Sequence, residues 1–477
     1  MAGLLFRQWL LVIWPMSFNL PVTVLSALSG MFGAKNRSQR RYFRKNWPTM
    51  IAGGSPGLSK KTGVVVKSDG GGGGTTQDIA LGFSDGKFVI LWSVSETSED
   101  SFHAEALGAY GFSDGTTHYC LAYVSRDAQA TADTAGYTNS KALALLNTSK
   151  AVAAECTASF SGSNLRLTWS TGDSGSQLIH YFVLGGAFSA QVVTTLTAKT
   201  STGSRDQTPL SFTPGFVHFI TNQGTFGSVT NGGGGAWGFA ASNGQRGAFD
   251  HTSEDNSAAG QSATYMVTTI GIAPVAFWVH YIKSGIPSVN GQMRVTNYIT
   301  NGWTEQWDVA AGSAYSYGVL ALVGLAYAIK YVDSATSTGD HAITGFGIAS
   351  EAVLAFTSAH PPSEVGSGTA DASLGIGAAT STSDEHACWN GDNDDADPTE
   401  TDRRDTATYF MLHATPGTPT LTLEASMTSF DRDGITPNYN TAPGSALGLM
   451  IVAFAEVQFA SAPQQQMHRR VREVVAY

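Results

Sequence analysis

One pattern of apolar and polar segments occurs three times in this chain. Each copy opens with an apolar run led by phenylalanine, continues through a glycine-flanked apolar run and a polar loop, and closes with an apolar run that follows Gly-Ser. The leading phenylalanines are Phe83, Phe212 and Phe346, about 130 residues apart. A period this long is typical of a domain rather than of one turn of a solenoid. The chain is therefore expected to be an array of one module.

The order of the runs is the same in every copy. The opening runs are 82–92, 212–220 and 346–356; the glycine-flanked runs are 107–112, 236–240 and 374–378; the closing runs are 175–183, 312–320 and 444–452. The tetrapeptide Thr-Ser-Thr-Gly precedes the second and third opening runs, at 200–203 and 336–339. The first copy has only Gly-Thr-Thr at that point, so it has diverged.

Composition favours β-structure. The chain has 54 glycines and only 13% charged residues, whereas helical surfaces usually need many Glu, Lys and Arg side chains. Residues 165–169 and 293–298 alternate apolar and polar side chains, as half-buried antiparallel strands do. Helix is expected only in short pieces, for example around 141–146.

The sequence thus predicts an all-β protein of three tandem antiparallel β-sandwich modules of the jelly-roll type. Strand residues expected in the core are Phe88, Ile90, Phe216, Phe219, Val353 and Phe356, because sandwiches fill their cores from inward-facing alternate positions. Phe83, Phe212 and Phe346 are expected at equivalent strand positions. The expected segments are an apolar and basic N-terminal extension at 1–50, a Gly/Ser-rich linker at 51–74, modules at 75–186, 187–326 and 327–457, and a C-terminal tail at 458–477.

Charge separates the extension from the modules. The whole chain has a net charge of −10, yet residues 1–50 contain no Asp or Glu. Because phosphate contacts need a cationic face, no nucleic-acid binding is expected of the modules. The basic run is expected to attach the protein to an acidic neighbour, an anionic lipid surface or nucleic acid, the alternative being a solvated disordered arm. The expected attachment residues are Lys35, Arg37, Arg40, Arg41, Arg44 and Lys45.

Residues 8–34 carry no charge and begin with a strongly apolar stretch. Three interpretations stay open: a membrane span, an assembly arm that packs on a partner subunit, and an upstream extension with initiation at Met16, Met31 or Met50. Pro15 and Pro21 interrupt the stretch as a span. If it does span, the positive-inside rule leaves the basic run and the modules in the cytoplasm.

Motifs for chemistry are sparse. Cys120, Cys156 and Cys388 show no zinc spacing, and buried free thiols are favoured over a Cys120–Cys156 disulfide. Polar loops at 125–133, 251–257 and 392–400 occupy corresponding points of the modules. The last loop fails the EF-hand pattern, so a solvated acidic loop is favoured over a calcium site.

Signals for catalysis in the sequence are weak. It has no Gly-x-Ser-x-Gly, His-Glu-x-x-His or paired-cysteine motif, and its histidines are scattered. No cofactor, metal or catalytic residue is therefore assigned. Four tryptophans could stack on sugars, although packing in the core or between sheets is the favoured role. They are Trp237, Trp303, Trp307 and Trp389.

The chain contains in succession Thr-Ser-Thr-Gly, a Gly-Phe or Phe-Thr-Pro turn that leads into an apolar strand, the run GFSDG at 111–115, a Ser/Asp/Ala loop, and the run SFDRDGITPNYNTAPGSA at 429–446. This succession resembles the tandem β-modules of tailed-bacteriophage and prophage structural proteins. The resemblance covers residues 75–457. It implies a virion component of the tail, the fibre or the capsid exterior, and no catalytic residue.

Together these features predict a non-enzymatic virion protein that works by assembly and surface recognition. The expected partners are other virion subunits, further copies of the chain and a host-surface glycan. The alternatives are a cell-surface carbohydrate-binding adhesin and, less favoured, a polysaccharide-degrading enzyme.

Overall fold

A computed structural model describes residues 57–457, except for 69–73, 173–174, 223, 256–261, 268, 271–272, 275–276, 284–285, 360–368, 394–395 and 397. The described residues belong to one compact unit. Among the described residues all regular elements are strands, and no helix there is long and apolar enough to cross a membrane. The predicted all-β class is confirmed.

The strands fall into three sets that match the sequence repeat. Module 1 contains β1 (Ser59–Val66), β2 (Thr75–Ala80), β3 (Gly86–Ser93), β4 (Phe102–Ala104), β5 (Ala106–Ser113), β6 (His118–Ser125), β7 (Thr134–Asn139), β8 (Leu143–Leu146), β9 (Val152–Ser161), β10 (Asn164–Thr171) and β11 (Leu178–Gly185). Module 2 contains β12 (Ser189–Thr197), β13 (Gly203–Gln207), β14 (Phe216–Thr221), β15 (Thr230–Asn231), β16 (Gly233–Ala241), β17 (Arg246–Ser253), β18 (Ser262–Val267), β19 (Thr269–Ile270), β20 (Ala273–Pro274), β21 (Phe277–Lys283), β22 (Ile286–Ile299), β23 (Gly302–Val309) and β24 (Ser316–Val323). Module 3 contains β25 (Leu325–Asp333), β26 (Gly339–Asp340), β27 (Ile343–Thr344), β28 (Ala352–Ser358), β29 (Thr369–Ala370), β30 (Ala372–Ala379), β31 (Glu385–Asp392), β32 (Thr401–Thr406), β33 (Met411–Thr415), β34 (Thr420–Asp431), β35 (Gly434–Thr441) and β36 (Gly448–Glu456).

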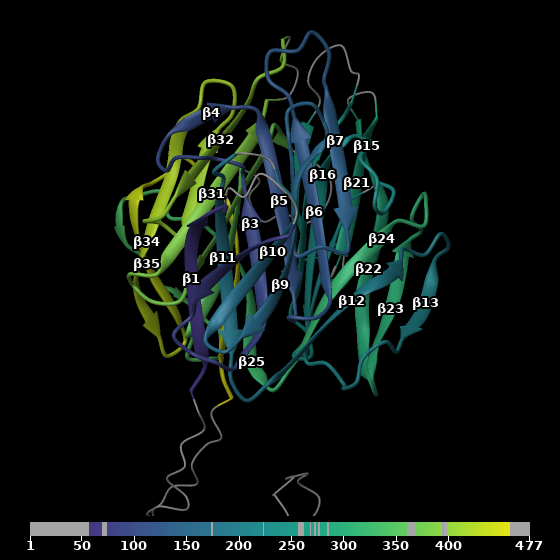
Figure 1. Ribbon diagram of the computed structural model, residues 1–477, viewed down its shortest axis with the longest axis vertical. Helices are drawn as coiled ribbons and strands as arrows, with labels where there is room; N and C mark the ends of the chain where they lie inside the picture. The colour runs from purple at the N-terminus through teal and green to yellow at the C-terminus, as the bar shows by residue number, and fades with distance from the viewer. Residues whose placement is uncertain are drawn as a thin grey trace, which may run out of the picture. The chain divides into compact units, whose positions relative to one another are not determined.

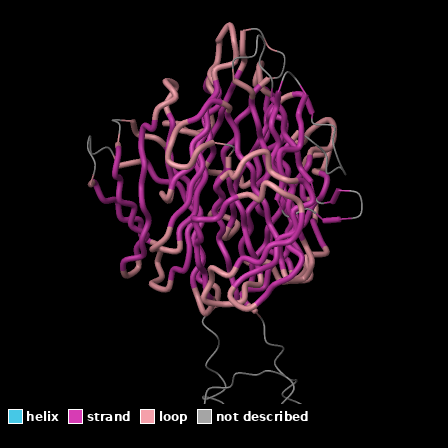
Figure 2. Tube along the Cα trace, turned by 90° about the vertical axis from the view of Figure 1, so that its right-hand side faces the viewer, coloured by secondary structure: helices cyan, strands magenta, loops and turns pink. Residues whose placement is uncertain are grey.

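Each module is a sandwich of one seven-stranded sheet and one smaller sheet. Figure 1 labels strands of all three modules, and Figure 2 shows that the described chain consists of strands joined by loops. The seven-stranded sheets have the orders β1-β11-β3-β5-β6-β7-β15, β12-β24-β14-β16-β17-β18-β29 and β25-β36-β28-β30-β31-β32-β4. The smaller sheets have the orders β2-β10-β9-β8, β13-β23-β22-β21 and β26-β35-β34-β33, with β27 also paired to β35. The predicted antiparallel pairing is confirmed throughout.

The last strand of every seven-stranded sheet comes from another module. Strand β15 of module 2 completes the sheet of module 1, β29 of module 3 completes that of module 2, and β4 of module 1 completes that of module 3. We call these three strands, with the loops that lead into them, the arms. Because each module gives one arm and receives one, the three modules form a closed ring.

The opposite edge of each sheet is also covered by a neighbour. Three backbone N–H groups at equivalent positions of β1, β12 and β25 donate to side chains in a hairpin turn of another module. The pairs are Thr62 with Thr380 Oγ1 (3.1 Å), Val192 with Asp114 Oδ2 (2.8 Å) and Ile329 with Gln245 Oε1 (2.8 Å). These bonds occupy donors of an edge that would otherwise be free to pair with another chain.

The central strands of the seven-stranded sheets are buried on both faces, as β5, β16 and β30 are at every residue. One face packs inside its own sandwich, as Val89 and Leu91 do in module 1. The other face joins the corresponding faces of the other two modules in a single central core, which contains Phe88 of module 1, Phe216 of module 2 and Phe454 of module 3. All six core residues expected from the sequence are buried, four of them in the central core and two, Phe219 and Val353, inside their own sandwiches.

Several expectations need correction. The linker predicted at 51–74 contains β1, whose eight residues pair with β11. The predicted boundary at 326/327 falls inside β25, and residues 143–146 of the predicted helix form β8. Phe83, Phe212 and Phe346 lie in the loops before the opening strands, where each packs on its own sandwich core, and not at strand positions. Phe83 and Phe212 correspond to each other, but Phe346 corresponds to Leu81 and Leu210, because the backbone N–H groups of these three residues make the equivalent hydrogen bonds.

A left-handed residue marks the point where each arm turns into the next strand. The three residues are Glu105, Gly232 and Asp371, with φ values of 75°, 94° and 75°. An L side chain in this region costs about 1–2 kcal/mol, and only glycine avoids the cost. The turn is therefore imposed by the ring, since two modules keep it without glycine.

We expect Gly232→Ala to lower the free energy of unfolding by about 1–2 kcal/mol in denaturant titrations, because the added Cβ meets no neighbouring atom and only the backbone conformation is penalised. Gly172→Ala, at an equally open position without positive φ, should change it by less than about 0.5 kcal/mol. Equal effects of the two changes would contradict this explanation.

Candidate functional site

The three polar loops that the sequence singled out follow equivalent strands, β6, β17 and β31. The described residues of these loops gather at one pole of the ring, at the top of Figure 1, which we call the apex. Strand β31 ends at Asp392, which is buried, and its Oδ2 atom accepts hydrogen bonds from Ser125 Oγ (2.7 Å) and Ser253 Oγ. These are the last residues of β6 and β17, so one carboxylate joins all three modules.

Below this carboxylate lies a second layer of equivalent residues, Tyr123, His251 and Asn390. Tyr123 Oη donates to Asn390 Oδ1 (2.9 Å), and its ring centroid lies 4.8 Å from that of His251. Burial lowers the pKa of His251 to about 3, so this imidazole is neutral at physiological pH. The third layer, Leu121, Phe249 and Cys388, belongs to the central core. The interior thus changes from polar at the apex to apolar.

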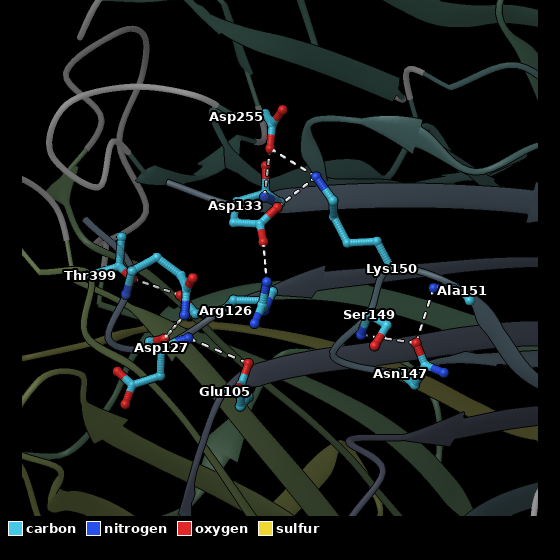
Figure 3. Close-up of polar contacts among 12 residues, drawn as sticks. Glu105, Arg126, Asp127, Asp133, Asn147, Ser149, Lys150, Ala151, Asp255 and Thr399 are labelled. Atoms are coloured by element: carbon cyan, nitrogen blue, oxygen red, sulfur yellow. Dashed lines mark hydrogen bonds and ion pairs between the residues drawn. The ribbon is translucent and has the colours of Figure 1, made fainter. Parts of the chain in front are cut away.

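The apex loops are tied together at the rim by ion pairs (Figure 3). Lys150 Nζ lies 2.6 Å from Asp133 Oδ1 and 3.5 Å from Asp255 Oδ1, and Arg126 Nη1 lies 2.5 Å from Asp133 Oδ2. Burial opposes ionisation of Asp133, but hydrogen bonds from Lys150 and Arg126 outweigh it and lower the pKa of this carboxyl. Thr399 of module 3 completes the rim, because its Oγ1 donates to the carbonyl of Arg126 (2.7 Å).

The apex is not arranged as a metal centre in the part of the chain that the structure describes. No group of three or more His, Cys, Asp or Glu side chains is placed there to hold an ion. Residues 394, 395 and 397 of the predicted acidic loop lie outside the described residues.

Module 3 holds a serine–histidine contact that sequence reasoning missed. Ser373 Oγ lies 2.8 Å from His413 Nε2 and accepts a hydrogen bond from Trp389 Nε1 (2.8 Å). The residues are 40 apart in sequence and carry no motif that would have revealed them. All three are buried, and burial lowers the pKa of His413 to about 3, far below that of an effective general base. This contact therefore holds the fold together and is not arranged for catalysis.

The interior has little free space in the described residues. A cavity of about 10 Å³ lies beside Tyr123, Trp237, Cys388 and Asn390 in the central core, which is room for about one water molecule. The four tryptophans named as sugar-stacking candidates are fully buried, so stacking on a sugar is wrong for them and the favoured packing role is confirmed.

The cysteines are free and buried, as favoured from the sequence. Cys120 and Cys156 both face the sandwich core of module 1. Burial raises the pKa of the Cys120 thiol to about 12 and that of Cys156 further, so neither is a reactive thiolate at neutral pH.

Both ends of the described chain lie at the pole opposite the apex, at the bottom of Figure 1. Glu351 joins them: Lys60 Nζ donates to its carbonyl oxygen (2.8 Å), and the backbone N–H of Glu456 donates to its Oε1 (3.0 Å). The six expected attachment residues from Lys35 to Lys45, and residues 8–34, lie outside the described residues.

Comparisons with known proteins give no family. No protein-family model matches the chain, and no curated protein matches it. Among solved structures, the chain aligns with the crystal structure of the LG1-3 region of the laminin alpha2 chain. The alignment has 8% sequence identity and covers 84% of this chain and 94% of that chain. The TM-score of 0.07 is too low to carry an argument.

We expect Asp392→Ala to lower the free energy of unfolding by about 2–4 kcal/mol, because hydroxyl donors from two other modules lose a charged acceptor. Asp340→Ala is the matched control: its carboxylate accepts one exposed hydrogen bond, from Thr428 within module 3, and its loss should cost less than about 1 kcal/mol. Equal free energies of unfolding of the two variants in urea would show that the hydrogen bonds of Asp392 do not stabilise the contact between the modules.

A second prediction concerns pH. Burial raises the pKa of Glu385 from 4.5 to about 8, although the N–H of Met427 donates to its Oε2. The folded protein therefore binds more protons than the unfolded chain between these values, and the stabilisation from this group is present below pH 4.5 and lost as pH rises through about 8. Glu385→Gln should flatten the fall in the free energy of unfolding between pH 5 and pH 8. An unchanged slope would contradict the assignment.

Proposed function

We propose that this protein is a non-enzymatic structural component of a tailed-phage virion, which displays a three-module ring on the particle. The proposal rests on one observation, which is that the two poles of the ring differ. The two ends of the described chain lie together at one pole, while the polar loops of all three modules gather at the other (Figure 1). Such an arrangement suits a protein that is attached at one pole and presents its loops at the opposite one.

Other observations support a structural role. The residues of modules 2 and 3 that resemble catalytic or sugar-binding groups, namely the four candidate tryptophans and the Ser373–His413 pair, are buried in hydrogen-bonded or aromatic packing. The ring is closed by edge strands and side-chain caps, which protect sheet edges from unwanted pairing when many copies are held close together. The basic run at 35–45 supplies the attachment element of the proposal, and the apex supplies the surface that faces a host or another subunit.

Deletion of residues 1–50 tests the attachment. The first strand begins at Ser59, so we expect the truncated protein to keep its β-sheet circular dichroism and its free energy of unfolding. Incorporation into purified particles of the parent phage should be lost, because the basic run is absent. Higher salt should weaken attachment of the full chain as well.

The control is deletion of residues 458–477, which should leave incorporation intact. Normal incorporation of the chain that lacks residues 1–50 would overturn the attachment role. Failure of the full-length protein to appear in any particle fraction would overturn the virion assignment itself.

A further inference from the structure

The arm of module 1 is added to module 3 as an extended strand. Strand β4 pairs antiparallel with β32, and the N–H of Glu105 donates to the carbonyl of Thr401 (2.9 Å). The side chain of Arg403 in β32 adds to this pairing, because its Nη1 donates to the carbonyls of Ala104 (2.7 Å) and Glu105 (3.0 Å). This is the geometry by which a sheet edge binds a separate peptide.

Phe102 of this arm makes two specific contacts with module 3. The ring of Phe102 meets Trp389 edge to face, with centroids 6.0 Å apart and planes at 88°. The guanidinium of Arg404 lies over the ring of Phe102, 5.0 Å from its centroid. Module 3 therefore contacts the phenyl ring with both a buried indole and a cation, which is a combination that discriminates among side chains.

The rest of the arm is complementary in charge. Residues 96–105 contain four acidic residues and no Lys or Arg. Glu96, only 1% exposed, lies 2.6 Å from Arg403 Nε through its Oε1, and Asp100 Oδ1 lies 3.6 Å from Arg404 Nη2. The two arginines are held in place by further contacts, Arg404 to Glu424 Oε1 (3.0 Å) among them.

The corresponding arm of module 2 differs. Residues 224–231 carry no charge, and Phe226 is 37% exposed and stacks on Tyr119 at 5.9 Å. Modules 1 and 2 are joined by residues 186–188, and modules 2 and 3 by Gly324 alone, whereas the junction of module 3 with module 1 has no peptide link. The acidic arm thus lies at the one junction that noncovalent recognition must close.

We infer that the β32 edge of module 3, with Trp389, Arg403 and Arg404, is a binding site for an acidic extended peptide that carries a phenylalanine. The arm of module 1 is the ligand of this site within the same chain. The same arm of a second copy of the chain binds there when the protein's own arm is displaced, because it carries the same phenylalanine and acids. Binding of this kind extends the sheet of module 3 and is specific because the phenyl ring and the acids have separate partners.

The test uses the full-length protein and a fluorescent peptide with the sequence of residues 96–105. Phe102→Ala weakens the protein's own arm, and Phe226→Ala is the matched control in the uncharged arm. We expect the peptide to bind the Phe102→Ala protein, by fluorescence anisotropy, at least about tenfold more tightly than it binds the wild type or the Phe226→Ala protein. A peptide with Gln and Asn in place of its acids, and one with Ala in place of its phenylalanine, should each bind about tenfold more weakly than the parent peptide.

Hydrogen exchange gives a second readout on the same proteins. Amides of β32 should exchange faster in the Phe102→Ala protein than in the wild type and regain protection when the peptide is added. Equal binding by all three proteins, equal binding of the neutral peptide, or failure of the peptide to protect β32 would each overturn the inference.

Discussion

The structure depends on a single constraint: its three large sheets are apolar on both faces. A sandwich covers one face of such a sheet with its smaller sheet and leaves the other to be covered by something else. Here the uncovered faces cover one another. Phe356 of module 3 lies 4.9 Å from Phe249 of module 2 and 6.5 Å from Tyr110 of module 1, measured between ring centroids. Since an exposed apolar face of this size would associate or aggregate, no module is expected to be stable alone.

Polar contacts between the modules determine which module lies beside which in the ring. Three equivalent positions at the apex hold Ser125, Ser253 and Asp392, so the two hydroxyl donors meet one carboxylate acceptor. Three identical serines or three identical aspartates could not form this pattern, since one arrangement lacks the charged acceptor and the other repels itself. The acidic arm of module 1 adds a second difference at the junction that has no peptide link. Divergence among the copies thus specifies which module lies beside which.

Much of this could be predicted from the sequence, because local patterns determine it. The triplicate order of apolar runs and the turn residues gave the strands, the modules and the buried phenylalanines. The polar loops were located because they break the apolar pattern at corresponding points. β1 was missed because its lysines and glycine resemble the flanking linker, although Lys60 and Lys61 direct their amines to carbonyl oxygens of Glu351 and Ala80.

The central core and the arms were missed for a different reason. Pairing between modules depends on distant residues, and single-sequence periodicity reports only the immediate neighbours. One signal was available: the run ALGAYGFS of β5 does not alternate with charged or strongly polar residues, and all eight of its residues are buried. Strands that lack alternation are buried on both faces, which implies a second layer beyond the sandwich. The serine–histidine contact of module 3 had no comparable signal.

The central claim is that three modules share one core and therefore one stability. Phe249→Ala tests it, because this module 2 residue lies in the central core and contacts module 3 directly. We expect a loss of about 3–5 kcal/mol, and native-state hydrogen exchange should show that the slowest amides of β3, β14 and β28 all exchange faster by the same factor. Faster exchange confined to β14 and the other strands of module 2 would contradict the claim and show three independent domains.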